Sequence, residues 1–209
     1  MPKIYFVTSN KHKFEEVKSF LEDIINVEQL DIEVEEIQSS NLELISKKKA
    51  LYAFKIVNKP LFVEDSGLFI DALKGFPGPY SSYVYKTIGI EGVLKLLKNC
   101  KNRNAKFVSI ISYIDSTLNE PICFVGIIEG EIANMARGSK GFGFDPIFIP
   151  KGHNKTFAED YELKKRISHR RKALEKFREF LIKNKKLRKL DKSNSSWQSW
   201  EWQSISNMF

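Results

Sequence analysis

The sequence has little of what marks secreted, fibrous or membrane-spanning proteins. Its 209 residues include 2 cysteines, 7 prolines and 11 glycines, and no apolar run approaches the roughly 18 residues that span a bilayer. Cys100 and Cys123 fit neither a metal-binding spacing nor a disulfide framework. The first residues read as a strand entering a polar turn, not as a signal peptide. We therefore expect a cytoplasmic protein with reduced thiols, whose 42% of hydrophobic residues can form one buried core.

Positive charge is concentrated in one part of the chain. The formal net charge is +8, and residues 161–192 alone hold 14 Lys and Arg against 4 Asp and Glu. The rest of the chain is therefore nearly neutral. A basic element of this kind binds polyanions, phosphorylated small molecules or RNA, or forms a solvated helix face. Charge alone does not decide among these.

The spacing of apolar residues predicts an α/β fold with a mixed central sheet flanked by helices. Strands are expected at 3–8, 27–37, 61–63, 105–114 and 121–132, and helices at 10–25, 42–58, 88–98 and 168–186. Sheets in such folds bind ligands at the carboxyl ends of their strands. Residues 1–186 are expected to form one domain, and residues 187–209 a Ser-rich tail that contains all three tryptophans.

The turn after the first expected strand is a candidate phosphate site. Thr8, Ser9 and Asn10 precede a helix, and Lys13 lies in its first turn. Free backbone N–H groups and the positive end of the helix dipole attract phosphate, which the Lys13 ammonium can also reach. A simple helix cap is the alternative explanation of Asn10.

Carboxylates at the ends of two expected strands form a second candidate. Glu36 ends one strand, and Glu64, Asp65 and Ser66 follow the short apolar strand at 61–63. Carboxylates that face one cleft can share Mg²⁺ with substrate phosphates, or one of them can orient a water molecule. Ordinary solvated strand ends are the alternative.

A third candidate is the loop at 139–150, where glycines alternate with aromatic residues. Phe142 or Phe144 can stack on a flat ring while exposed backbone groups approach the edge of that ring, and Asp145 adds an acid. Core packing of these phenylalanines is the alternative.

The basic segment that follows this loop contains Lys164 and predicts Ser168 as a helix N-cap. His169 and Arg170 are then the first residues of that helix, and both are donors. A generic basic helix face is the alternative.

Five blocks, in order along residues 3–184, resemble those of the inosine triphosphate pyrophosphatase family. They are Thr8-x-Asn10-x-x-Lys13-x-x-Glu16, Val63-Glu64-Asp65-Ser66-Gly67-Leu68, Gly75-x-Pro77-Gly78-x-Tyr80-Ser81, Gly141-Phe-Gly-Phe-Asp-Pro-Ile-Phe148 and Ile167-Ser168-His169-Arg170-x-x-Ala173. Each block is weak by itself, whereas the five together are specific.

The resemblance implies a two-lobed α/β enzyme, usually a homodimer, with the nucleotide in a groove between the lobes. It implies Mg²⁺ as cofactor and hydrolysis of ITP, dITP and XTP to the monophosphate and pyrophosphate. This reaction removes non-standard nucleotides from the nucleotide pool. By matching position, Lys13 and Asp65 would be catalytic, with Asp65 as the base for water. Expected metal ligands are Glu36, Glu64 and Asp65, and expected substrate contacts are Thr8, Ser9, Asn10, Lys13, Lys49, Ser66, Phe142, Phe144, Asp145, Lys164, His169 and Arg170.

Three consecutive lysines at 47–49 leave the register of Lys49 open. Two departures also limit this transfer. Leu163 stands where the family often has an acid, and the tail past about residue 186 has no counterpart in the family pattern.

Two other functions remain as alternatives. One is a nucleic-acid-binding module that uses the basic 161–192 element, although an acidic cluster at strand ends would repel a polyanion. The other is a triphosphatase for modified pyrimidines. The Ser168-His169-Arg170 block argues against it, because this block favours a purine substrate. We therefore expect a nucleotide substrate and neither a membrane nor a nucleic acid as partner.

Deleting residues 190–209 tests the boundary of the expected domain. Because the matched blocks end near residue 184, we expect kcat/KM for ITP to stay within about threefold of the full chain. Gel filtration and thermal melting of the truncated protein are the controls. Dissociation of an oligomer or a melting drop of several degrees would show instead that the tail is a docked structural element.

Overall fold

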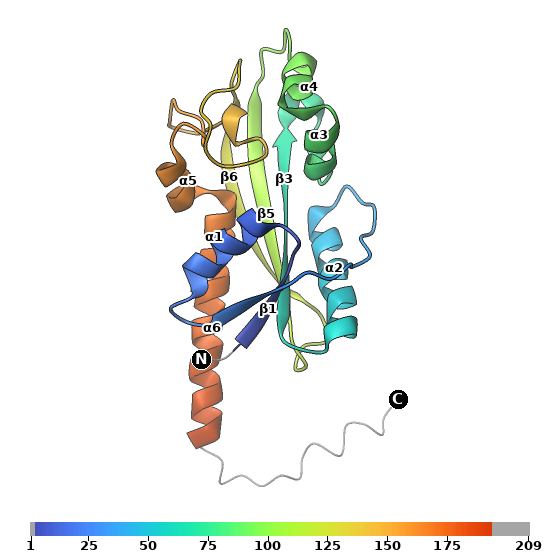
Figure 1. Ribbon diagram of the computed structural model, residues 1–209, viewed down its shortest axis with the longest axis vertical. Helices are drawn as coiled ribbons and strands as arrows, with labels where there is room; N and C mark the ends of the chain where they lie inside the picture. The colour runs from blue at the N-terminus through green and yellow to red at the C-terminus, as the bar shows by residue number, and fades with distance from the viewer. Residues whose placement is uncertain (1–2, 194–209) are drawn as a thin grey trace. The chain divides into compact units, whose positions relative to one another are not determined.

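The computed structural model describes residues 3–193, and contacts divide the chain into two units, Met1–Phe177 and Arg178–Phe209. The first unit contains all the described strands (Figure 1). The strands are β1 Lys3–Val7, β2 Asn26–Leu30, β3 Leu61–Ile70, β4 Pro77–Gly78, β5 Asn104–Ile114, β6 Ile122–Ile132 and β7 Phe148–Pro150. The α-helices are α1 Lys11–Leu21, α2 Leu42–Val57, α3 Ser81–Thr87, α4 Gly89–Leu96, α5 Tyr161–Ile167 and α6 His169–Ser193, with 3-10 turns at Asp71–Leu73 and Asp145–Ile147. The described part of the second unit is the C-terminal part of α6.

The strands form one mixed sheet in the order β2-β1-β3-β5-β6-β7, with β4 also paired to β3. β1 runs parallel to β2 and β3, and the other pairs are antiparallel. Helices flank this sheet (Figure 1). The predicted fold class, α/β with a mixed central sheet, is confirmed, as is the pairing of the two long strands β5 and β6.

β1 accompanies only the first part of β3. Tyr5 is opposite Leu61 and Phe6 is opposite Phe62, whereas β3 continues to Ile70. The chain runs from β1 to β2 on one side and then crosses to β3 on the other, so the strand order reverses at β1. Ligands of open α/β sheets bind at such a reversal, outside the carboxyl ends of the strands.

Alternation along β3 assigns its side chains to two different layers. Phe62 stacks on Phe6 with ring centroids 4.6 Å apart, and its ring lies 5.0 Å from that of Phe177 in α6. Leu61 and Val63 pack instead with the buried alanines of α2. Because successive side chains of a strand point to opposite faces, Glu64 faces the α6 side and Asp65 faces α2.

The start of α6 packs very closely on β6. A Cβ at Gly126 would lie 2.0 Å from the carbonyl oxygen of His169, so only glycine allows this approach. Two lysines of α6 also bind the edge of β6. Lys172 Nζ donates to the carbonyl of Ile127 at 2.9 Å, and Lys176 Nζ donates to that of Val125 at 2.6 Å.

The predicted end of the third strand is wrong. The strand was expected at 61–63, but β3 pairs with β5 from Leu61 to Ile70. Glu64 and Asp65 therefore lie inside a long strand. Glu36 is also not at a strand end, because β2 stops at Leu30 and Glu36 lies in the segment before α2.

Helix boundaries differ as well. α3 and α5 were not predicted, since each has only 7 residues and shows little periodicity. The helix expected at 88–98 is α4, and Gly89, with a φ of 63°, separates it from α3. α6 continues past its expected end at 186 to Ser193, and the tryptophans at 197, 200 and 202 lie outside the described residues.

Candidate active site

The turn between β1 and α1 is fixed by its own hydrogen bonds. Asn10 Oδ1 accepts from the Lys13 N–H at 3.0 Å, and Thr8 Oγ1 accepts from the Asn10 N–H at 3.1 Å. The predicted cap is confirmed, with Ser9 inside the turn. The first N–H groups of a helix have no intrahelical acceptor, so this helix start can bind an anion.

Lys13 leaves the turn and reaches β3. Its Nζ donates to the Glu64 carbonyl at 3.0 Å and lies 2.8 Å from Glu64 Oε2. Ser109 of β5 donates its hydroxyl to the other carboxylate oxygen, Oε1, at 2.6 Å. Glu64 is only 3% exposed.

The protein keeps Glu64 ionised. Burial alone would raise the pKa of this carboxyl, but the charges of Arg170 and Lys13 outweigh it and hold the pKa well below its usual value. Both carboxylate oxygens already have partners. Glu64 is therefore a buried anion held by the protein's own cations.

Arg170, the second residue of α6, joins three elements. Its Nη1 donates to Glu16 Oε2 at 2.6 Å, its Nε lies 3.3 Å from Glu64 Oε1, and its Nη2 donates to Ser66 Oγ at 3.4 Å. Arg170 is 2% exposed. The guanidinium thus connects α1, β3 and α6, and Ser168 caps the helix that carries it by accepting from the Arg171 N–H at 3.2 Å.

Sequence reasoning assigned no role to Glu16, which the structure places at the centre of these charges. Besides Arg170, it accepts from Lys164 Nζ at 3.1 Å. Burial raises the pKa of Glu16, but the charges of Arg170 and Lys164 have the larger, opposite effect. The pKa of Glu16 therefore lies below its usual value. The available signal was its spacing of three residues from Lys13, which puts both side chains on one helix face.

Lys164 ties this network to the loop that contains Phe142. Its Nζ donates to Asp145 Oδ2 at 2.7 Å, and the same oxygen accepts from the Phe142 N–H at 2.8 Å. Lys164 Nζ also lies 4.2 Å from the centroid of the Phe142 ring, within cation–π range. The ammonium group of Lys164 in α5 therefore contacts both the Phe142 loop and α1.

The two phenylalanines of the loop have different environments. Phe144 is 3% exposed and packs its ring edge-on against Tyr85 at 5.5 Å. Phe142 is partly exposed, and the His12 ring stacks on it at 5.6 Å. Phe142 thus has the more accessible ring.

His169 is enclosed and neutral. Its ring stacks on Phe107 at 4.6 Å, and its buried Nδ1 has no hydrogen-bond partner. Burial and the neighbouring charge of Arg170 lower the pKa of His169 well below its usual value.

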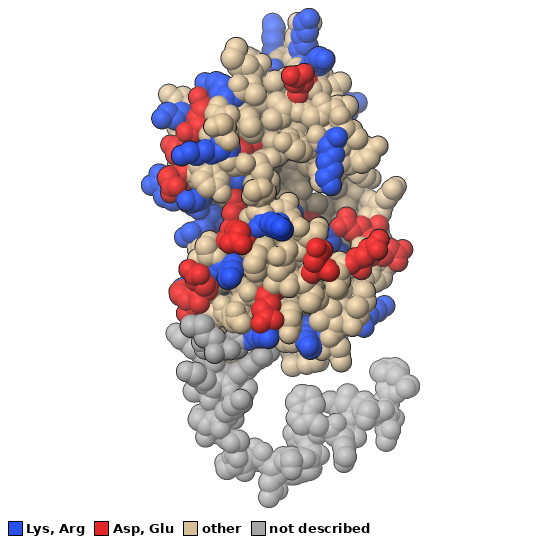
Figure 2. All heavy atoms as spheres, in the orientation of Figure 1, with Lys and Arg blue, Asp and Glu red and all other residues tan. Residues whose placement is uncertain are grey.

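A second cluster lies on the α2 side of β3. Lys49 Nζ, from α2, donates to Asp65 Oδ1 at 3.2 Å and also to Glu36. Burial lowers the pKa of Lys49, but the Asp65 and Glu36 carboxylates outweigh it and raise the pKa above its usual value. Asp65 Oδ2 is buried without a hydrogen-bond partner. Figure 2 shows several acidic side chains beside a hollow, in the region where Figure 1 draws the segment before α2.

The donor set is suited to a metal held partly by the ligand. Glu36 and Asp65 each place one carboxylate oxygen beside the ammonium group of Lys49. No three metal-ligating side chains gather within residues 3–193. Mg²⁺ commonly binds through one or two carboxylates plus substrate phosphates, so this pair fits it, whereas Glu64 lies on the opposite face with both oxygens engaged.

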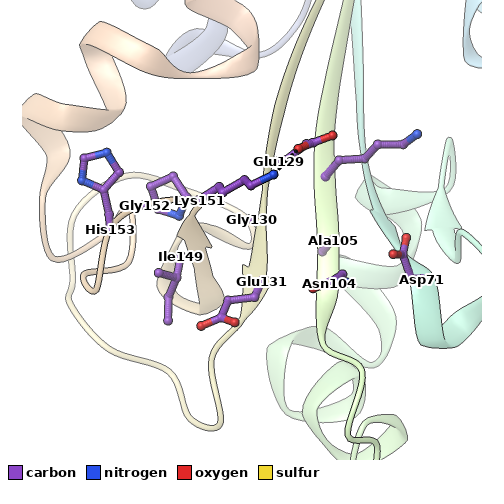
Figure 3. A pocket seen from close by; sticks show the side chains of 12 residues that line it. Asp71, Asn104, Ala105, Glu129, Gly130, Glu131, Ile149, Lys151, Gly152 and His153 are labelled. Carbon is purple, nitrogen blue, oxygen red and sulfur yellow. Dashed lines mark hydrogen bonds and ion pairs between the residues drawn. The ribbon is translucent and has the colours of Figure 1, made fainter.

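A separate cavity of about 590 Å³ lies over the ends of β5, β6 and β7, and its lining contains none of the expected site residues (Figure 3). Two of its charged side chains, Lys151 and Glu129, form an exposed ion pair of 3.3 Å. This cavity is therefore not the candidate site. In the part of the chain that is described, no helix is both long and apolar enough to span a membrane.

Fold and site together define an α/β protein with a cluster of charged side chains on each face of β3. A model of the Ham1 family matches residues 4–180, and the chain belongs to this family. It is 50% identical over 184 residues to the dITP/XTP pyrophosphatase of Methanopyrus kandleri, covering 87% of this chain and 97% of that protein. It is also 50% identical over 186 residues to the dITP/XTP pyrophosphatase of Thermococcus kodakarensis, covering 88% of this chain and all of that protein.

Solved structures agree with this assignment. The Staphylococcus aureus Ham1 protein superposes with a TM-score of 0.78 at 35% identity, covering 87% of this chain and 99% of that one. A HAM1 protein from Coxiella burnetii gives a TM-score of 0.78 at 33% identity, covering 88% and 100%. The resemblance stated from the five sequence blocks is confirmed.

The neutral state of His169 predicts a pH-dependent stability. Because its pKa is lowered in the folded protein, the unfolded chain binds one more proton below about pH 6.5, so acid favours unfolding. We expect this residue to lower the free energy of unfolding by up to about 1.4 kcal/mol per pH unit between pH 7 and 5. Urea denaturation of the wild type and of His169→Gln at several pH values measures the difference. Parallel pH profiles would contradict a buried neutral imidazole.

Proposed function

We propose that this chain hydrolyses non-standard purine nucleoside triphosphates of the ITP, dITP and XTP type to the monophosphate and pyrophosphate, and so removes them from the nucleotide pool. One observation carries the proposal. Around the part of β3 that β1 leaves uncovered, two lysines, a capped helix start and a carboxylate with an unpaired oxygen converge. The two relatives that are 50% identical to this chain are named dITP/XTP pyrophosphatases, which supports it.

The triphosphate would bind where these cations lie. In the proposal, the turn formed by Thr8, Ser9 and Asn10 presents backbone N–H groups to the phosphates. Lys13 and Lys49 approach from the two faces of β3 and neutralise part of the charge. Both ammonium groups are paired with carboxylates, so a bound phosphate would compete with Glu64 and Asp65 for them.

Glu36 and Asp65 would hold Mg²⁺. When bound there, the ion supplies charge neutralisation at the phosphates. Glu64 instead positions Lys13 and Arg170, because its oxygens contact both. Of the three acidic residues expected as metal ligands, Glu36 and Asp65 would therefore hold the ion, and Glu64 would not.

Asp65 would take the proton of the attacking water. Its buried Oδ2 has no partner and can accept a hydrogen bond. The water oxygen bonds to phosphorus, the bridge between the α and β phosphates breaks, the proton passes to Asp65, and pyrophosphate leaves. A general base of this kind contributes about 10²–10⁴ in rate.

The base would stack on Phe142. The nearest cationic donors are Lys164 and Arg170, at 4.2 and 5.3 Å from its ring centroid. A carbonyl at position 6 of the purine accepts from such donors, whereas the amino group of adenine does not. Asp145 and His169 lie behind these donors, Asp145 in contact with Lys164 and His169 next to Arg170 in α6.

Nucleic-acid binding is the weaker proposal, because two basic residues of the 161–192 element, Lys164 and Arg170, are buried in ion pairs. A homodimer, a cytoplasmic location and the expected boundary at residue 186 stay predictions.

A nucleotide panel tests the function. Pyrophosphate release is measured with ITP, dITP, XTP, ATP, GTP and modified pyrimidine triphosphates, each with and without EDTA. The proposal requires strong preference for the first three and loss of turnover with EDTA, restored by Mg²⁺. Equal turnover of ATP would remove the proposed specificity.

Asp65→Asn tests the base. The amide cannot take the proton, so we expect kcat for dITP to fall about 10²–10⁴-fold without unfolding. Asp71→Asn is the matched control, since it makes the same change at an exposed position in the 3-10 turn after β3. An Asp65→Asn variant that keeps more than a tenth of wild-type kcat would remove Asp65 from the chemistry.

A further inference from the structure

His12 makes an aromatic contact that the fold does not require. It is an exposed residue in the first turn of α1, where a helix needs no aromatic side chain. Its imidazole nevertheless lies nearly parallel to the Phe142 ring, with an interplanar angle of 13° and centroids 5.6 Å apart. This is the geometry of an offset stack, which leaves part of each ring face uncovered.

The two rings come from the two parts of the site that a nucleotide would have to connect. In the sequence, His12 lies between Asn10 and Lys13, at the helix start that is the candidate phosphate site. Phe142 lies next to Lys164 and Arg170, with its N–H held by Asp145. His12 is thus the aromatic residue of the phosphate end that reaches the ring at the base end.

We propose that His12 is a substrate-binding residue that holds the purine base by stacking, together with Phe142. The imidazole lies over part of the Phe142 ring, and the base would stack against both rings. The inference rests on the proposed function, because it assigns a second ring to the base site of that reaction.

Stacking predicts a specific pattern of effects. Every purine has the same flat face, so His12 should contribute to the affinity of all purine nucleotides alike and leave the preference for dITP over ATP to the donors at the base edge. It should not affect ligands that lack a base. A contact of His12 with phosphate would produce the opposite pattern, with pyrophosphate weakened as much as the nucleotides.

Kinetics of three variants separate these patterns. Because base stacking on an aromatic side chain contributes to affinity, we expect His12→Ala to raise KM for dITP and for ATP about tenfold, with kcat and the inhibition constant of pyrophosphate unchanged. His12→Phe should restore KM to within about threefold, since it keeps a flat ring. His153→Ala is the matched control, an exposed histidine at the separate cavity of Figure 3.

A measurement without turnover complements the kinetics. The chain has 3 histidines, so the His12 ring proton signals can be assigned in NMR spectra by their loss in His12→Ala. Inosine monophosphate should shift these signals, and pyrophosphate should leave them in place.

Four results would overturn the proposal. They are an unchanged KM in His12→Ala, an equal loss of affinity for pyrophosphate, no recovery in His12→Phe, or His12 signals that respond to pyrophosphate but not to inosine monophosphate. A wild type that hydrolyses none of the nucleotides would instead remove the proposed function, and the NMR titration then still decides whether His12 contacts a base.

Discussion

Arg170 between Glu16 and Glu64 is the interaction on which the arrangement of the site depends. One guanidinium from α6 binds a carboxylate of α1 and a carboxylate of β3 while it is almost fully buried. Removing one partner of such a group leaves a buried unpaired charge, at a cost of about 3–5 kcal/mol. The same carboxylates orient Lys13 and Lys164. The groups that would meet a nucleotide are therefore held in place by the ion pairs that also join the elements of the fold.

The alternation of β3 explains how two neighbouring acids acquire different chemistry. Glu64 points to the face covered by α6, where cations surround it and each oxygen has a partner. Asp65 points to the face covered by α2, where one oxygen contacts Lys49 and the other has no partner. A difference of one residue thus separates a carboxylate with both oxygens engaged from one with an unpaired oxygen.

Local signals in the sequence were sufficient for part of this structure. The cap at Asn10, the paired strands β5 and β6 and the cap at Ser168 follow from rules that span a few residues, and all three are present. The length of β3 was not predictable in this way, because its polar middle resembles a strand end and only the long ladder with β5 keeps it extended. Glu16 was missed for the same reason, since its partner Arg170 lies 154 residues away. Phe142 and Phe144 look equivalent in the sequence, and only tertiary packing distinguishes them.

The lysines of α6 at the edge of β6 have a consequence for the behaviour of the protein at high concentration. A sheet edge with free carbonyl groups is a template on which another chain can add a strand, the first step towards aggregates. Here Lys172 and Lys176 occupy the carbonyls of Ile127 and Val125 and place two positive charges along that edge. An incoming strand would have to displace both ammonium groups from their acceptors and accept their charge beside it. The helix that carries the candidate site residues Arg170 and His169 therefore also covers this part of the sheet edge.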